Sequence, residues 1–469
     1  MRGGCYMGRR KEQMKYTLNL FLGTTGLILG GCVSKTKSMS SDPEHLWRPV
    51  QITESRVDIS KPLFSSNGSY SLAALVELGI SNNPQTRNAW WQAKKALAQQ
   101  GRAEAPYFPN LTARIDATKQ QTGAPISRIE SWGPSLNITY RLFQFGTHRA
   151  DAKSAACALA AANYKFNHVL QSVVCDIQKN YYNYTSAVAT IEARESSLKD
   201  ASASFDAVEN RQKHGLARTQ DVLLAKADKL QAAYELQAAQ AQLENCRAEL
   251  ALSVGIPVSK DFEVQVDIKE SKPLTEKVEV LLNQTLKRRS DILAAEASVH
   301  AADWGHLKTQ REALPAVDFT GSMGALRYHH DARWQNNYNL GIGVFWNIFN
   351  GFDTQYKALA DYANVKSQQF ALHQQQLQAL RDVWTEFHTF QSFVQLLDSA
   401  KALEAAASES FKAIRIGYDA GLNSLLDLLS AQKTLAAARL KRIHSQTELA
   451  IHWVQLAYVS GRLELRDNL

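Results

Sequence analysis

Two aspartates hold the same place in a stretch that occurs twice in the chain. Asp221 lies six residues after Gly215, and Asp427 lies six residues after Gly421, so glycine and aspartate both recur at an offset of 206. A carboxylate at the start of a helix accepts hydrogen bonds from free backbone N–H groups and interacts favourably with the helix dipole. Helix capping is therefore one interpretation of this pair.

A cysteine near the N-terminus has the surroundings of a modified residue. Basic residues precede an apolar run, Leu18 to Ile28, that is too short for a stable membrane anchor, and Leu29-Gly30-Gly31-Cys32 follows. This order resembles the signal peptide and lipobox of bacterial lipoproteins. The resemblance implies cleavage after residue 31, a covalent lipid on Cys32 and export from the cytoplasm. A plain secretory signal with an incidental cysteine is the alternative.

The other reactive side chains lack the spacing of an enzyme or a metal site. The sequence contains no Gly-rich phosphate loop, no nucleophile elbow and no histidine pair at zinc spacing. His329-His330 is interpreted as part of a solvated turn. Cys157 and Cys175 are 18 residues apart on one predicted helix, so about 27 Å separates them and they cannot form a disulfide. We predict a protein that is not an enzyme and that has no cofactor apart from the lipid.

The composition argues against two further classes of protein. A mean hydropathy of −0.30 excludes a bundle of membrane-spanning helices. The net charge is +8, and it falls to +4 without residues 1–31, which hold five basic residues and one acidic residue. This charge is too small and too dispersed to indicate a nucleic-acid partner.

Each repeated Gly-Leu pair interrupts a very long segment without glycine or proline. Those segments are 147–214, 216–254, 353–416 and 422–460. Glycine ends a helix cheaply in the left-handed conformation, so each break predicts the tip of a helical hairpin. A helix of this length is on the order of 100 Å long and needs packing partners throughout. Near-heptad leucines predict lateral coiled-coil packing: Leu223, Leu230, Leu236, Leu243 and Leu250.

Two pairs of amphipathic strands precede the long helices. Apolar and polar residues alternate from Leu111 to Ala117 and from Val317 to Met323, and the returning strands run from Leu136 to Leu142 and from Ile342 to Ile348. We expect the first turn at Gly123-Ala124-Pro125 and the second across the polar segment 327–333. Aromatic residues at the strand ends predict a membrane-interface girdle: Tyr140, Phe143, Phe145, Trp346 and Phe349.

The repeat predicts the organisation of the whole chain. We expect a signal peptide at 1–31, a lipidated tether at 32–70, a first repeat at 71–257, a linker at 258–276, a second repeat at 277–463 and a tail at 464–469. The β-hairpins are expected at 108–142 and 315–348, and the helical tips at 215–216 and 421–422. Four strands are too few for a closed barrel, for which about eight are needed, so the chain must assemble with copies of itself.

Several motifs in fixed order resemble the TolC/OprM family of outer-membrane efflux proteins. They are the lipobox, the duplication, the strand-to-helix junction Leu142-Phe143-Gln144-Phe145-Gly146, and the tip motif followed by Ala431-Gln432. The resemblance covers about residues 70–465. It implies a mostly α fold with a transmembrane β-barrel contribution, in which the chain is a tandem-repeat subunit of four strands and long helices. Three subunits would form a 12-stranded barrel in the outer membrane and a helical tunnel through the periplasm.

The same resemblance assigns roles to the hairpin tips. It implies that Gly215-Leu216 and Gly421-Leu422 dock a periplasmic adaptor (membrane fusion) protein. It also places Asp427 in a ring of carboxylates at the periplasmic entrance, where three like charges would bind cations and disfavour anions. A latch between Tyr418 and Asp221 would hold the hairpins together until the adaptor separates them. An interfacial aromatic is the alternative role of Tyr418.

The resemblance also implies partners and a function. The partners are two further copies of the chain, the adaptor, an inner-membrane RND, MFS or ABC transporter, and outer-membrane lipid. The expected function is the outer-membrane exit duct of a tripartite pump that exports drugs or other small toxic compounds. Two alternatives stay open: the outer-membrane component of a type I protein secretion system, and a lipid-anchored coiled-coil spacer that conducts nothing.

Overall fold

The computed structural model describes residues 69–121, 129–259, 262–266, 277–328 and 331–463. Within this part of the chain, helices predominate and four long strands form one sheet. In chain order the elements are β1 (Ser69–Tyr70), α2 (Leu72–Asn82), α3 (Pro84–Glu104), the 3₁₀ helix η2 (Ala105–Tyr107), β2 (Asn110–Gln120), β3 (Ile129–Phe143), α4 (Thr147–Lys213), α5 (Thr219–Val254), β4 (Glu263–Val264), α6 (Val278–Arg288), α7 (Ser290–Glu312), β5 (Ala316–Tyr328), β6 (Asp331–Phe345), α8 (Asp353–Asp419) and α9 (Leu425–Val459).

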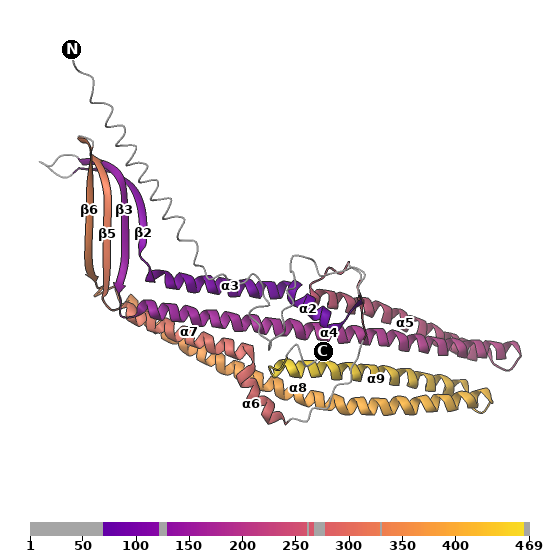
Figure 1. The fold of residues 1–469 in the computed structure, drawn as a ribbon. Helices are drawn as coiled ribbons and strands as arrows, with labels where there is room; N and C mark the ends of the chain where they lie inside the picture. Colours follow the sequence, from indigo (N-terminus) through magenta and orange to yellow (C-terminus); the bar gives the residue numbers. More distant parts are fainter. Residues whose placement is uncertain (1–68, 122–128, 260–261, 267–276, 329–330, 464–469) are drawn as a thin grey trace, which may run out of the picture. The chain divides into compact units, whose positions relative to one another are not determined.

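The two longest helices, α4 and α8, each contain 67 residues and each turns back at the repeated Gly-Leu pair (Figure 1). Gly215 has φ +74° and Gly421 has φ +79°, and a Cβ atom built on either would touch nothing within 4 Å. The requirement for glycine is therefore one of backbone conformation rather than space. The N–H of Leu216 donates to the Arg211 carbonyl at 2.8 Å, which is the helix-ending bond that a left-handed glycine permits.

Four helices from both repeats form one layer. In this layer α3 packs against α4, α4 against α7, and α7 against α8 (Figure 1). Toward the tips, α5 packs along α4, α9 packs along α8, and α9 also contacts α4. The long helices thus find along their length the partners that their apolar residues require.

The sheet has the strand order β2-β3-β5-β6, and every neighbouring pair is antiparallel. Its pairing places side chains of one kind in cross-strand rows. One row is apolar and contains Leu111, Ile138, Gly321 and Leu340; the next row is polar and contains Thr112, Asn137, Ser322 and Asn339. Because successive residues of a strand face opposite sides, the sheet has one apolar and one polar face.

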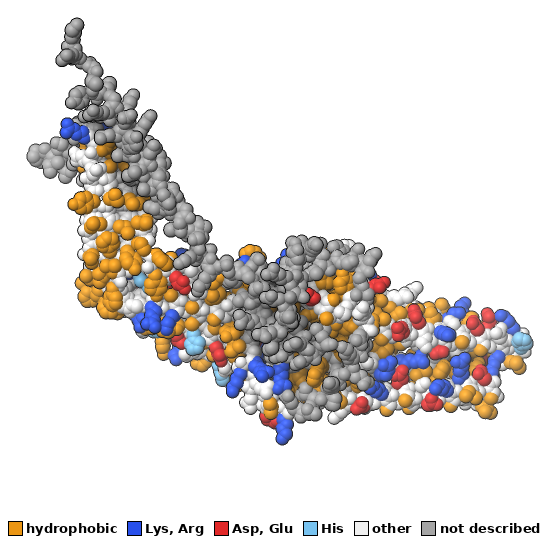
Figure 2. All heavy atoms as spheres, viewed as in Figure 1, with side chains coloured by type: hydrophobic (Ala, Val, Ile, Leu, Met, Phe, Trp, Pro, Cys, Tyr) orange, Lys and Arg blue, Asp and Glu red, His pale blue; other side chains and the backbone are white. Residues whose placement is uncertain are grey.

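The apolar face of the sheet is largely exposed in a single chain. Figure 2 shows apolar side chains spread over the visible face of the sheet. Leu111, Ile115, Leu340, Ile342 and Val344 are all exposed. Soluble monomers rarely leave an apolar surface of this kind uncovered. Among the described residues, no helix has both the length and the apolar character that a membrane crossing requires.

The structure confirms the predicted fold class and differs in two details. The strands β5 and β6 continue through most of the segment 327–333, which we expected to be a loop, because backbone pairing proceeds regardless of side-chain polarity. The segment between the repeats contributes β4, which pairs in parallel with β1. The lipobox with Cys32, the Gly123-Ala124-Pro125 turn and His329-His330 lie outside the described residues.

Cys157, Cys175 and Cys246 are free thiols. Cys175 is buried in α4, and burial together with the nearby Asp176 carboxylate raises the pKa of its thiol to about 12. A thiol with so high a pKa is almost never a thiolate at neutral pH, and the thiolate is the reactive form. Cys175 is therefore a packing residue.

Candidate functional site

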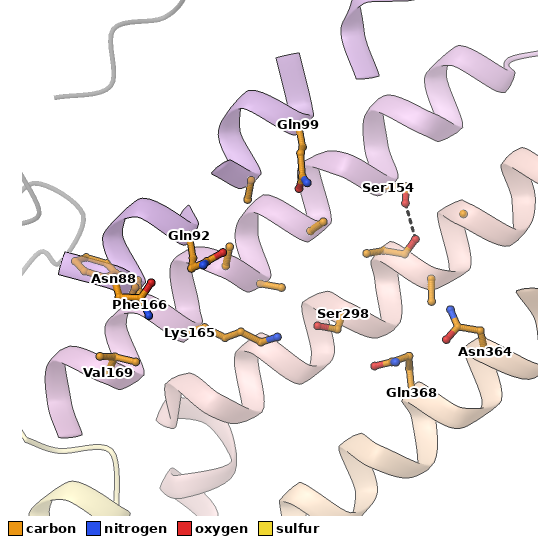
Figure 3. Close-up of a pocket in the computed structure, with 18 of the residues that line it drawn as sticks. Asn88, Gln92, Gln99, Ser154, Lys165, Phe166, Val169, Ser298, Asn364 and Gln368 are labelled. Atoms are coloured by element: carbon orange, nitrogen blue, oxygen red, sulfur yellow. Dashed lines mark hydrogen bonds between the residues drawn. The ribbon is translucent and has the colours of Figure 1, made fainter. Parts of the chain in front are cut away.

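One surface of the four-helix layer is hollowed into a groove of about 1040 Å³. Residues at helical spacing on α3, α4, α7 and α8 line it, as Figure 3 shows for Gln92, Lys165, Ser298 and Gln368. Alanines and Gly305 let the helices approach closely, and the Ser154 hydroxyl donates to the Ala301 carbonyl at 2.7 Å. The groove is therefore formed by four helices rather than by one element.

The lining of the groove combines small apolar residues with polar side chains that include charges of both signs. Its polar members are Gln85, Asn88, Gln92, Gln99, Ser154, Lys165, Ser298, His306, Asp361, Asn364 and Gln368. These amides and hydroxyls are able to hold ordered water along the groove. Among the described residues, no group of three His, Cys, Asp or Glu side chains is arranged to hold a metal ion.

Asp427 caps the first turn of α9. Its carboxylate accepts hydrogen bonds from the Ser424 hydroxyl at 2.7 Å and from the Ser424 N–H at 3.0 Å. The Asp427 N–H in turn donates to the Ser424 hydroxyl oxygen at 3.2 Å. The Ser424 hydroxyl and N–H hold the pKa of Asp427 below its usual value of 3.8. Asp427 is fully exposed, so an ionised carboxylate stands at the mouth of this hairpin at neutral pH.

Asp221 takes the equivalent place at the start of α5, with fewer contacts. Its carboxylate accepts a hydrogen bond from the Arg218 N–H at 3.2 Å. In a single chain both aspartates therefore cap the start of a helix, which was the first interpretation of this pair. No hydrogen bond joins Asp221 to the Tyr418 hydroxyl within the described part of this chain, so the structure does not bring the two members of the predicted latch together.

Tyr418 instead contacts an arginine of the other repeat. The Arg211 guanidinium lies over the Tyr418 ring, 4.4 Å from its centroid, and Nη2 donates to the carbonyls of Tyr418 at 3.0 Å and Asp419 at 3.1 Å. Tyr418 is only 7% exposed and packs in a core cluster with Phe411, Leu425 and Leu428. Sequence reasoning missed Arg211, although the repeat contains a signal: residue 417, at offset 206, is glycine.

A buried polar network joins the two hairpins deeper in the bundle. The Gln432 amide of α9 donates to the Asp228 carboxylate of α5 at 3.3 Å, and Lys433 approaches the same carboxylate at 3.5 Å. The Ser204 hydroxyl of α4 donates to the Gln432 carbonyl oxygen at 3.3 Å. This network and the Arg211 contacts tie the second hairpin to the first at different heights.

The tips themselves present exposed apolar side chains. Leu216 and Leu422 follow the tip glycines and are 78% and 83% exposed. Ile416 and Leu426 beside the second tip are also exposed. Apolar side chains at the end of a helical hairpin are suited to packing against another helical protein.

Comparisons with known proteins agree with this geometry. The family model described as outer membrane efflux protein matches residues 75–256 and 281–462, two segments that are themselves offset by 206. The pyoverdine export outer membrane protein OpmQ of Pseudomonas aeruginosa is 24% identical over 446 residues, which are 90% of this chain and 92% of that protein. The outer membrane protein TolC of Escherichia coli is 22% identical over 408 residues, 83% of this chain and 81% of that protein.

A solved structure has the same fold. The outer-membrane channel OprN superposes with a TM-score of 0.76 at 20% identity, over 89% of this chain and 98% of that chain. The two matched segments together span most of the chain and contain both hairpin tips and all four long strands. The chain belongs to the outer membrane efflux protein family.

Proposed function

We propose that this outer-membrane efflux protein is the exit duct of a tripartite pump for small organic compounds. The two-faced sheet is the observation that carries the proposal. Its exposed apolar rows match hydrocarbon, and its polar rows match a water-filled interior. The groove on the helical layer also supports a water-filled interior, since polar side chains from four helices contribute to its lining.

Assembly of copies into a ring follows from the free edges. The sheet ends at β2 on one side and β6 on the other, and the helical layer ends at α3 and α8. Strand directions alternate from β2 to β6, so β6 of one copy and β2 of the next would pair antiparallel. One kind of contact thus satisfies both edges, because each copy pairs through β6 with one neighbour and through β2 with the other, and this head-to-tail contact closes a ring. Three copies give the 12 strands that the family resemblance implies.

A seam of apolar residues supports the same contact between copies. Tyr356, Ala363, Phe370, Leu377 and Trp384 lie seven residues apart on α8, and all are exposed in one chain. A sevenfold repeat of this kind is typical of helices that pack side by side. On the opposite edge, α3 exposes Trp91 and Ala98, also seven residues apart.

We assign the tips Gly215-Leu216 and Gly421-Leu422 to a periplasmic adaptor, and we expect the adaptor to connect the duct to an inner-membrane transporter. The exposed leucines at both tips support this assignment. OpmQ is named for pyoverdine export, and a TtgC relative from Pseudomonas putida is named for toluene efflux. Both names describe small molecules, which favours such cargo for this chain over a folded protein.

The purified assembly is expected to conduct ions when it is reconstituted in a planar lipid bilayer. A continuous water-filled interior gives discrete single-channel steps, because each inserted assembly adds one aqueous path. A coiled-coil spacer would bind the bilayer without adding current. Absence of steps from correctly assembled protein would therefore contradict the proposal.

Removing the charge of Asp427 is expected to weaken the block of that current by divalent or trivalent cations added on the periplasmic side. Asp427→Asn is the informative change, because the amide oxygen can still accept the Ser424 N–H while the negative charge is lost. With three charges removed per ring, we expect the blocking concentration to rise about tenfold or more. Block of the wild type should persist at pH 5, since the lowered pKa keeps Asp427 ionised there.

Asp419→Asn is the control for this test, since Asp419 is also exposed beside the same tip. It should leave the block unchanged. An unaltered block in Asp427→Asn would place the carboxylate ring elsewhere. The capping role of Asp427 would stand in either case, because melting of the variant reports on it separately.

A further inference from the structure

The C-terminal end of α8 is held by a side chain from the other repeat. Arg211 lies in the last turn of α4, and its guanidinium both covers the Tyr418 ring and donates to the carbonyls of Tyr418 and Asp419. We call this set of contacts the Arg211 clamp. Tyr418 and Asp419 are 207 and 208 residues from Arg211, so the clamp joins the two helical hairpins rather than the two helices of one hairpin.

The chemistry of the clamp suits the end of a helix. The last carbonyls of a helix lack intrahelical partners and carry the negative end of its dipole, so a cation that donates to them is favoured. Hydrogen bonds from a guanidinium are stronger than those between neutral groups, and a cation over an aromatic face adds a further attraction. The Tyr418 ring is packed in an apolar cluster, so the Arg211 guanidinium contacts a side chain that is itself held in place.

The repeat is broken at this position, where Asn423 occupies the space that a side chain would need. Residue 417, the counterpart of Arg211, is glycine, and a Cβ atom there would lie 2.3 Å from Asn423 Nδ2. Asn423 folds back over this place and donates to the Ile414 carbonyl at 3.2 Å. The first hairpin thus supplies the clamping side chain, and the second tip is built without one.

Other contacts fix the body of the second hairpin independently of the clamp. Arg439 of α9 donates to the Ser196 hydroxyl of α4 at 3.0 Å, and Gln432 joins Asp228 of α5. Both contacts are on α9, whereas the clamp acts on the last residues of α8. Loss of Arg211 would therefore loosen the tip, which the apolar cluster around Tyr418 still contacts, while the bundle stays assembled.

We propose that Arg211 positions the second hairpin tip and thereby sets the width of the periplasmic entrance. The proposal rests on the proposed function, since it concerns the entrance of that duct. Residues Gly421, Leu422 and Asp427 follow the clamped helix end directly. When the clamp opens, these residues can move away from the first hairpin, and the entrance widens.

Arg211→Ala is expected to raise the single-channel conductance in planar bilayers. Losing charge-assisted hydrogen bonds and a cation–π contact shifts an equilibrium by about tenfold or more, so we expect the open population to rise by about that factor. Arg211→Lys retains the charge without the planar fork and should fall between the wild type and Arg211→Ala. Lys213→Ala is the matched control, because it removes the same charge two residues away and disturbs only the i,i+4 pair with Glu209.

Tyr418→Phe separates the clamp from a Tyr418–Asp221 latch. The substitution keeps both the ring and the backbone carbonyl that Arg211 contacts, so the clamp predicts wild-type conductance. A hydroxyl-dependent latch predicts an increase, and that increase would overturn the clamp. So would an Arg211→Ala conductance equal to that of Lys213→Ala.

A distance measurement tests the clamp without relying on conduction. Spin labels on cysteines introduced at the exposed positions Asn210 and Lys412 report the separation of the two hairpins. We expect Arg211→Ala to broaden and lengthen this distribution, and Lys213→Ala to leave it unchanged. An unchanged distribution in Arg211→Ala overturns the clamp, whereas a non-conducting wild type with a broadened Arg211→Ala distribution overturns only the proposed function.

Discussion

Replacing Leu340 by arginine is expected to abolish stable insertion into the outer membrane. Leu340 is 67% exposed in a single chain and lies in the apolar cross-strand row of the sheet. It is six residues from both Trp334 and Trp346, so it lies midway between two aromatic ends of the same strand and its continuation. An arginine at the bilayer midplane of a barrel costs about 2–4 kcal/mol, and an assembly of identical copies incurs that cost once per copy.

Asn339→Arg is the control for this prediction. Asn339 is the preceding residue of the same strand and lies in the polar row with Ser322 and Asn137. Its arginine would point into water, so this variant should reach the outer membrane at wild-type levels. The measurement is the amount of protein in outer-membrane fractions, together with the sensitivity of the cells to exported compounds. Equal insertion of the two variants would show that the faces of the sheet have been assigned the wrong way round.

Phe370→Glu is expected to prevent the chain from assembling with its copies. Phe370 is 74% exposed and lies at the centre of the α8 seam. Burying an aromatic side chain contributes about 2–3 kcal/mol, and a carboxylate buried in its place without a partner adds a further penalty at every contact between copies. Size-exclusion chromatography with light scattering, in detergent, should therefore show monomers instead of the assembled species.

Ala371→Glu provides the matched change. Ala371 is exposed and points about 100° away from the seam around the helix. The substitution adds the same charge as Phe370→Glu, one residue further along α8. It should assemble as the wild type does. Assembly of Phe370→Glu with normal stability would mean that the copies meet along another face of α8.

The regular parts of the fold could be predicted because their signals are local. Alternation at Leu111–Ala117 reports a two-faced strand from a few residues, and Gly215 and Gly421 mark hairpin tips in long runs where Gly417 is the only other glycine or proline. The offset of 206 then duplicates every inference, which makes chance matches improbable. The two aspartates were likewise placed correctly at helix starts.

Contacts between distant residues could not be predicted in this way. The Arg211–Tyr418 contact joins residues 207 apart, and no periodicity reports which side chain of α4 will meet the end of α8. The pairing of β1 with β4 involves two residues on each side, which is too short for a pattern. The groove was also invisible in the sequence, because it depends on the order in which α3, α4, α7 and α8 pack.

The position of the small β1–β4 pair has a consequence for the predicted lipidation of Cys32. Tyr181 of α4 donates to the Gln265 carbonyl at 2.7 Å, so the pair is fastened 34 residues down α4, about 50 Å from the start of that helix. Covering this height takes about 15 extended residues, whereas 36 residues separate Cys32 from Ser69. If Cys32 carries a lipid, as the sequence predicts, this length of chain is sufficient to connect the bilayer with the β1–β4 pair, about halfway along α4. Such a lipid would hold each subunit near the bilayer before the barrel closes.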